Sequence, residues 1–281
     1  MNISINSTKT FVFVNSFLLF LSLFQYKSTQ YFTTNYDYQV IEFLFNFLIF
    51  TVRNYLLLYF IEFGTQNKPA ISSINVPKED YKYEFDYNVI SATVIESFTH
   101  TIIQHSNIIY IFNNPYPYTE IIYFIPISFC FEIIFDFFHY ITHLFLHNKY
   151  IYKYLHKKHH KFKHPKAITT FYQDPIDVII TNAVPTILTL YIIPNNYISY
   201  LQFNLITVYK SFIEISGHIG KKTYPTCCFS QFIWLPKSLQ IELYAEDHDL
   251  HHSLNNCNYS KRFSLWDKLF GTYKPGYHIA R

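Results

Sequence analysis

Three groups of histidines have the spacing that a metal site built on helices requires. They are His143-Leu-Phe-Leu-His147, His156-Lys-Lys-His159-His160 and His248-Asp-Leu-His251-His252. Side chains three and four residues apart lie on the same face of a helix, so each group can present several imidazoles to one ion. Imidazole is a ligand for both iron and zinc. Eight histidines in this pattern predict two metal ions.

The first group belongs to a longer polar stripe on an apolar segment. Its members follow one another at helical spacing: Glu132, Asp136, His139, His143 and His147. Such a stripe is expected to face the protein interior, because polar and ionisable groups are costly in lipid. We predict that His143 and His147 bind metal, that Asp136 or Glu132 accepts the outer imidazole N–H of a ligand, and that His139 is a further ligand or an outer partner. The alternative is a hydrogen-bond network between helices.

The second and third groups repeat one pattern in separate parts of the chain. A basic loop that contacts anionic lipid could explain the second group, which has lysines around it. It does not explain the third group, which lies among Glu246, Asp247 and Asp249. We therefore interpret both groups as metal ligands and Asp247 as a candidate outer partner.

Other histidines fall outside these groups. His218 lies four residues after Glu214, and the two are candidate catalytic residues, with His218 either a ninth ligand or a group that holds water. The remaining histidines follow no spacing pattern and are interpreted as surface or loop residues: His100, His105, His164 and His278.

The composition favours a membrane protein. Half of the 281 residues are hydrophobic and only 15% are charged, whereas about a quarter are charged in an average soluble domain. Residues 11–24 are either a membrane anchor, which we favour, or a cleaved signal, and residues 89–112 either span or lie in the interface. The clearer apolar segments are residues 39–61, 118–147, 176–193 and 197–216.

The distribution of lysines orients the predicted spans. Seven lysines lie between residues 149 and 166, which predicts that this segment is cytoplasmic. Segments 176–193 and 197–216 flank Pro194-Asn195-Asn196, a turn at which the chain would cross and return. All three histidine groups then share one compartment. We expect an all-α integral membrane bundle with a cytoplasmic helical cap that carries the two metals, divided into an anchor region 1–117 and a metal domain 118–281.

Several classes of function are disfavoured. A net charge of +3 without an RNA-binding signature argues against nucleic acid as a partner. The five glycines form no dinucleotide fingerprint, so electrons would come from another protein. Four cysteines without zinc-ribbon spacing are interpreted as reduced thiols: Cys130, Cys227, Cys228 and Cys257.

Two stretches resemble the fatty acid hydroxylase and sterol desaturase superfamily. Residues 139–160 are similar to the 4-methylsterol oxidase branch, and residues 248–272 are similar to cholesterol 25-hydroxylase around its last histidine group. The resemblance covers residues 118 to about 273. Its closing pattern matches Asn258, Trp266, Asp267, Gly271 and Thr272.

This resemblance implies an enzyme of the endoplasmic reticulum that uses two irons, with zinc possible as purified. Dioxygen and electrons from cytochrome b5 or its reductase would oxidise a lipid C–H bond. The implied ligands are His143, His147, His156, His159, His160, His248, His251 and His252. Ile215 stands where methylsterol oxidases have a histidine, and Asp174-Pro175 replaces their His-Pro pair, which leaves the particular reaction open.

The leading prediction is hydroxylation of a sterol or related lipid. Desaturation by the same site is an alternative that spacing cannot separate from it. A metal transporter or a non-catalytic metal-binding protein is a third possibility, although transport sites lie near the bilayer midplane on broken helices. Here the second and third histidine groups lie outside the predicted spans.

Overall fold

A computed structural model describes residues 5–35, 39–71, 86–105, 117–194, 198–222 and 228–276. Within these ranges the chain is helical, and one isolated bridge pairs Ala70 with Lys221. The predicted all-α class is confirmed. The long helices are α1 (Ile5–Asn35), α2 (Gln39–Thr65), α3 (Tyr87–His105), α4 (Pro117–Leu146) and α8 (Tyr200–Gly217).

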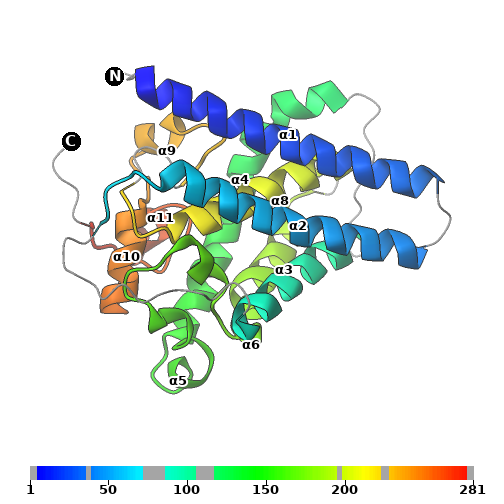
Figure 1. The fold of residues 1–281 in the computed structure, drawn as a ribbon. Coiled ribbons are helices and arrows are strands. Elements are labelled where there is room, and N and C mark those ends of the chain that lie inside the picture. The colour runs from blue at the N-terminus through cyan, green and yellow to red at the C-terminus, as the bar shows by residue number, and fades with distance from the viewer. Residues whose placement is uncertain are drawn as a thin grey trace.

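Shorter helical segments connect and cap the long ones (Figure 1). A π-helical turn, η3, joins two of them into one bent helix. The segments are α5 (Tyr152–Leu155), η1 (His159–Lys161), η2 (Ala167–Phe171), α6 (Pro175–Val178), η3 (Ile179–Ala183), α7 (Val184–Ile192), α9 (Trp234–Ser238), α10 (Ala245–Leu254) and α11 (Leu265–Leu269).

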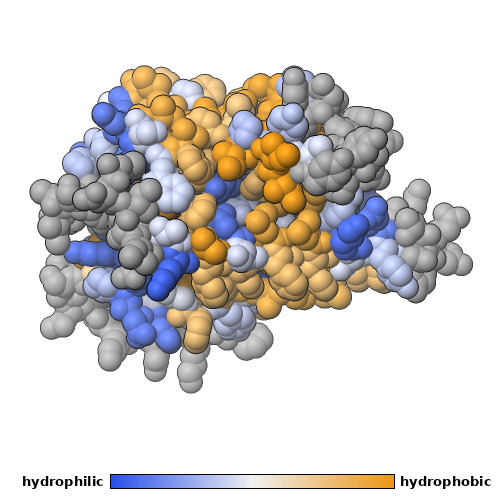
Figure 2. Space-filling model, turned by 90° about the horizontal axis from the view of Figure 1, so that it is seen from above, coloured by the Kyte–Doolittle hydropathy of each residue, from blue (hydrophilic) through white to orange (hydrophobic). Residues whose placement is uncertain are grey.

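Four helices in the described residues are long and apolar enough to cross a membrane. They cover Thr8–Phe32, Val40–Thr65, Thr119–Leu146 and Pro175–Ile192. The expectation of membrane-spanning helices is confirmed to this extent. Figure 2 shows a largely apolar surface across the middle of the molecule, with hydrophilic residues gathered toward its ends.

Helix α8 lies inside the bundle and packs against α1, α2 and α4. Every side chain from Leu201 to Ser216 is buried, including Lys210 and Glu214. The enclosure explains why a helix with several polar residues is stable here, because those residues contact protein and not lipid. The second segment of the predicted hairpin, which corresponds to α8, is therefore the centre of the bundle. Its other leg, α6 to α7, packs on α4.

The histidine-bearing segments gather at one end of the bundle. Helix α4 ends there, and α5, α10 and α11 lie at the same end (Figure 1). The chain thus places the predicted cap on one side of the apolar belt. The division at residues 117 and 118 stays a prediction, since α1 and α2 pack directly on α8.

Candidate metal centre

Nine histidines form two adjacent clusters at this end of the bundle. Within each cluster the potential ligand nitrogens all lie within 4.8 Å of one another. Cluster A contains His143, His147, His156, His160 and His251, and cluster B contains His159, His218, His248 and His252. The structure brings together all eight histidines of the three sequence groups and adds His218.

Each His-x-x-His-His group is divided between the clusters. His156 and His160 face cluster A, whereas His159 faces cluster B. The third group does the opposite, because His248 and His252 face cluster B and His251 faces cluster A. Residues four apart share a helix face more closely than residues three apart. In each group the i, i+3 histidine faces the other cluster from its two neighbours.

The two groups rest on different backbone structures. His248, His251 and His252 lie within helix α10. His156 is the C-cap of the one-turn helix α5, and His159 begins a 3-10 turn. The second group thus lies on two short helical turns. The prediction that its three histidines share one face of a regular helix was wrong.

The ring nitrogens have the separations of metal ligands. In cluster A, the Nε2 atom of His156 lies 3.0 Å from Nε2 of both His143 and His160. In cluster B, Nε2 of His248 lies 2.9 Å from that of His218 and 3.1 Å from that of His252. Metal–nitrogen bonds of about 2.0–2.1 Å at tetrahedral or octahedral angles place ligand nitrogens about 2.8–3.4 Å apart. The donor set fits a metal ion in each cluster.

Two further nitrogens support this fit. The Nε2 atoms of His147 and His251 are buried and have no hydrogen-bond partner among the described residues. Buried polar atoms are normally satisfied. A metal ion in cluster A would satisfy both.

The outer nitrogens of several candidate ligands donate to fixed acceptors. Nδ1–H of His143 donates to the Tyr259 carbonyl and that of His251 to the Cys257 carbonyl, each at 2.7 Å. Nδ1–H of His156 donates to the Asp177 carboxylate at 2.8 Å. These bonds put the proton on Nδ1 and leave the lone pair of Nε2 for metal.

The acceptor carbonyls of Tyr259 and Cys257 lie on a loop that two carboxylates hold. Asp136 accepts the backbone N–H groups of Lys261, Arg262 and Phe263 at 2.8–3.0 Å. Asp267 accepts those of Tyr259 and Ser260 at 2.8 Å. The loop is therefore rigidly placed, and two ligands of cluster A are oriented by it.

Three predicted outer partners have other roles. The prediction that Asp136 or Glu132 accepts an imidazole N–H was wrong, because Asp136 binds the loop and Glu132 pairs with Nε of Arg262 at 2.7 Å. Asp247 accepts the backbone N–H of Tyr244 and that of Gly276, so it stabilises the start of α10. In these contacts the three carboxylates stabilise the protein around the metal centre and do not orient an imidazole.

His139 and Glu214 also differ from expectation. His139 lies outside both clusters, and its Nδ1–H donates to the Thr181 carbonyl in the π-helical turn at 2.8 Å. The Glu214 carboxylate pairs with Lys210 at 2.9 Å and Arg262 at 2.8 Å. Both ion pairs are made by Oε1, while Oε2 accepts from the Asn182 amide at 3.2 Å, so the carboxylate supports the scaffold and its catalytic role stays a prediction. The Glu214 carbonyl accepts Nδ1–H of His218 at 2.9 Å.

The interpretation of the unpatterned histidines was partly wrong. His100 is buried in α3, where its Nδ1 lies 3.1 Å from Nη2 of Arg53. His164 bonds the Asp249 carboxylate at 3.0 Å. His278 lies outside the described residues, as does Cys227, while Cys130, Cys228 and Cys257 are free thiols.

Asp177 and Arg262 were not predicted from the sequence. Asp177 is fully buried within an apolar segment, and a lone carboxylate in such a segment is a signal that was available. Arg262 joins Glu132 of α4 to Glu214 of α8. No spacing in the sequence connects these three residues.

Burial favours the neutral form of several of the clustered imidazoles. Burial, together with the neighbouring His251 and His156, lowers the pKa of His147 to about 2, and burial lowers the pKa of His251 to about 3. The pKa values of His159, His160, His248 and His252 also fall well below the ordinary value for the same reasons. Neutral imidazole is the form that binds metal.

A family model described as fatty acid hydroxylase matches residues 128–272, just over half of the chain. Fatty acid hydroxylase vlmA of Lecanicillium sp is 31% identical over 147 residues, covering 50% of this chain and 40% of that protein. Very-long-chain aldehyde decarbonylase GL1-9 of Oryza sativa subsp. indica is 27% identical over 156 residues, covering 53% and 54%.

A shorter match is to cholesterol 25-hydroxylase of Rattus norvegicus, which is 50% identical over 34 residues, covering 12% of this chain and 11% of that protein. The chain thus spans about half the length, or less, of these relatives. No solved structure matches it significantly.

Proposed function

The chain belongs to the fatty acid hydroxylase family, and we propose that it is a membrane-bound di-iron oxidoreductase that uses dioxygen to hydroxylate a sterol or related lipid. The observation that carries the proposal is the convergence of nine histidines, eight of them buried, into two adjacent clusters at the end of an apolar bundle. Two irons would supply the one-electron chemistry that dioxygen needs to attack an unactivated C–H bond.

The residues of the chain would hold the irons and exclude water. His143, His156 and His251 are fixed through their outer nitrogens, so their Nε2 atoms need no rearrangement when metal binds. Every histidine of the clusters except His147 is buried. Exclusion of bulk water protects a reactive oxidant from side reactions.

A lipid substrate suits the position of the clusters. Helix α4 carries His143 and also spans the apolar belt, and Ile141 and Leu144, beside His143, are exposed on its outer surface. A hydrophobic substrate can therefore reach the cap from the bilayer without crossing water. We place the enzyme in the endoplasmic reticulum with the clusters facing the cytoplasm, in accord with the lysine-rich segment beside them.

Electrons would come from a separate protein, cytochrome b5 or its reductase. Hydroxylation consumes dioxygen, two electrons and two protons, and yields the alcohol and water. Lys149, Lys153, Lys157 and Lys158 are exposed on the cap and offer a basic surface to an acidic donor. In this proposal residues 118–281 form the metal domain, and residues 1–117 anchor it.

Desaturation of a lipid by the same site is the nearest alternative, because both reactions begin with removal of hydrogen from carbon. A transporter or non-catalytic metal protein is less well supported. The clusters lie at one end of the bundle, whereas transport sites lie near the midplane.

The test compares lipid extracts from a sterol-producing host that expresses either the wild-type chain or a His251→Ala, His252→Ala variant. We expect an oxidised lipid only with the wild type, since the double variant removes one ligand from each cluster. Mass spectrometry separates an added oxygen atom from the loss of two hydrogens. An unchanged lipid profile from iron-loaded wild-type protein would contradict both reactions, and the same product from the variant would contradict the assigned site.

A further inference from the structure

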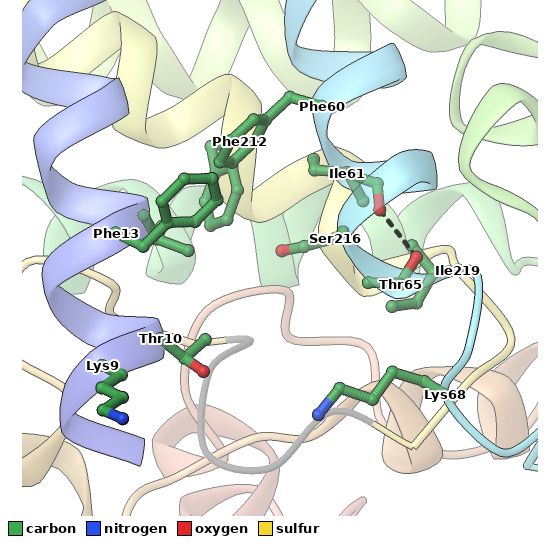
Figure 3. Close-up of a pocket in the computed structure, with 12 residues that line it drawn as sticks. Lys9, Thr10, Phe13, Phe60, Ile61, Thr65, Lys68, Phe212, Ser216 and Ile219 are labelled. Carbon is green, nitrogen blue, oxygen red and sulfur yellow. Dashed lines mark hydrogen bonds between the residues drawn. The ribbon is translucent and has the colours of Figure 1, made fainter. Parts of the chain in front are cut away.

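A cavity lies apart from the metal centre, between the start of α1 and the ends of α2 and α8 (Figure 3). Its volume is about 340 Å³, which is within the range of roughly 300–1,000 Å³ for small-molecule sites. Its apolar lining comes from three helices and the turn after α8: Phe13 and Val14, Phe60 and Ile61, and Phe212 and Ile219.

The cavity does not open onto the histidine clusters. Phe212 and Ser216 line it from one face of α8, whereas Lys210 and Glu214 point to the ion pairs on the metal side. Residues two positions apart in the sequence, such as Lys210 and Phe212, are separated by about 200° around a helix. Helix α8 therefore stands between the cavity and the network that supports the metal centre.

The aromatic wall is continuous and partly open to lipid. The ring of Phe60 lies 5.5 Å from that of Phe13 and 6.5 Å from that of Phe212. Phe13 is 62% exposed. A flexible hydrocarbon chain from the bilayer would bury apolar surface against these rings. Filling the cavity in this way would also add van der Waals contacts, and both effects stabilise binding.

Two lysines lie at the opposite end of the cavity from the phenyl rings, as Figure 3 shows for Lys9 and Lys68. The apolar span of α1 begins at Thr8 and that of α2 ends at Thr65. Both lysines thus lie at the edge of the apolar belt, on the side of the metal centre, where lipid head groups are found. No ion pair between described residues involves either lysine.

More positive charge lies close by. Nζ of Lys221 donates to the Thr65 carbonyl at 2.7 Å, beside the cavity. Burial lowers the pKa of Lys221, an effect that Glu62 opposes and Lys166 increases. The mouth of the cavity is therefore basic, and Glu62 is an acid near it.

We propose that this cavity binds an anionic phospholipid, with the phosphate and acidic head group between Lys9 and Lys68 and one acyl chain along Phe13, Phe60 and Phe212. The charge of the two lysines selects an acidic over a zwitterionic head group. The site is distinct from the metal centre and does not depend on turnover.

The test is native mass spectrometry of the full chain in nanodiscs that contain equal amounts of phosphatidylserine and phosphatidylcholine. We expect the protein to retain phosphatidylserine preferentially. Each lysine near an anionic lipid contributes a factor of roughly five in affinity, so Lys9→Ala, Lys68→Ala is expected to lose up to roughly 30-fold in selectivity.

Two further variants separate the site from general electrostatics and from misfolding. Lys149→Ala, Lys153→Ala removes the same charge from the cap outside the cavity, where each lysine lies over a neighbouring tyrosine ring, and is expected to retain the selectivity. Gly64→Leu fills the cavity from α2. A Cβ atom on Gly64 would meet nothing within 4 Å, so this variant is expected to fold with wild-type metal content and lose the lipid.

Equal phosphatidylserine retention by the wild type, the Lys9, Lys68 variant and the Gly64 variant would overturn the proposal. An equal fall in the Lys149, Lys153 variant would also overturn it, because the selectivity would then arise from the whole basic surface. Binding of added oleate without any binding of phosphatidylserine would make the occupant a fatty acid and not a phospholipid.

Discussion

Replacement of Asp177 by asparagine tests how the metal centre is held. The Asp177 carboxylate accepts Nδ1–H of His156 at 2.8 Å, and both side chains are buried, at 0% and 2% exposure. The substitution keeps the shape of the side chain and removes its charge. His156 belongs to cluster A alone, so the perturbation should affect one metal ion and not the other.

The expected magnitude follows from the type of bond. A hydrogen bond to a charged group contributes about 1.5–3 kcal/mol, which corresponds to roughly 10- to 150-fold in a binding constant. Loss of a partner of a metal-bound histidine typically weakens metal affinity by about 10- to 100-fold. We therefore expect cluster A to lose roughly 10- to 100-fold in affinity, with cluster B changed by less than about threefold.

The assay is competition between metal-free protein and a chelator of known affinity, followed by cobalt absorption and by metal content per chain. Asp174→Ser is the matched control. Asp174 pairs with Lys158 on the surface and caps the N-terminus of α6, and serine keeps the cap. This control is expected to bind two metals like the wild type.

Two results would refute the reasoning. If Asp177→Asn binds both metals with wild-type affinity, the bond to His156 does not position a ligand. If it weakens both sites equally, the assignment of His156 to a single cluster is wrong.

Other predictions concern single residues. His251→Ala and His252→Ala are each expected to lower the metal content from two ions to one, but from different clusters, which cobalt spectra should distinguish. Burial lowers the pKa of His218 from 6.5 to about 3; the unfolded chain therefore binds more protons between these values, and the stability of metal-free protein should fall as the pH drops below 6.5, measured by denaturation at pH 7.5 and 5.5. Arg262→Met leaves Glu132 and Glu214 without their shared cation and should cost roughly 3–5 kcal/mol of unfolding free energy; a melting temperature equal to wild type would contradict this. Gly220→Ala should destabilise the protein by roughly 1–2 kcal/mol or more in chemical denaturation, because φ is +61° and the new Cβ would lie 2.4 Å from the Pro165 carbonyl oxygen.

The long helices could be predicted because their signal is local. Apolar runs of about 20 residues follow from the thickness of the bilayer, and such runs predicted α2, α4 and the α6 to α7 segment. The shorter run 11–24 predicted only the middle of α1. Helix α8 was found in the same way, but its polar residues were not explained. Their partners come from other helices, so only packing shows that α8 is enclosed.

The identity of most candidate ligands was also a local matter, because spacing of three and four residues marks a shared helix face. The distribution of these histidines between the two clusters was not a local matter. The division of each His-x-x-His-His group between clusters depends on how α10 lies against α5 and η1, and His218 joins cluster B through the end of α8. Spacing within a segment carries no information about the angle between segments.

By itself, the sequence determined an all-helical membrane chain with eight histidines suited to two metals, since helix period and hydrophobic length are properties of neighbouring residues. The tertiary structure alone decided which imidazoles meet, that Asp177 and the carbonyls of Tyr259 and Cys257 orient them, and that Asp136 holds the loop between. These contacts join residues up to 127 positions apart. Such contacts arise when the buried surfaces of several helices pack together. The spacing of residues along one segment does not specify how that segment packs against another.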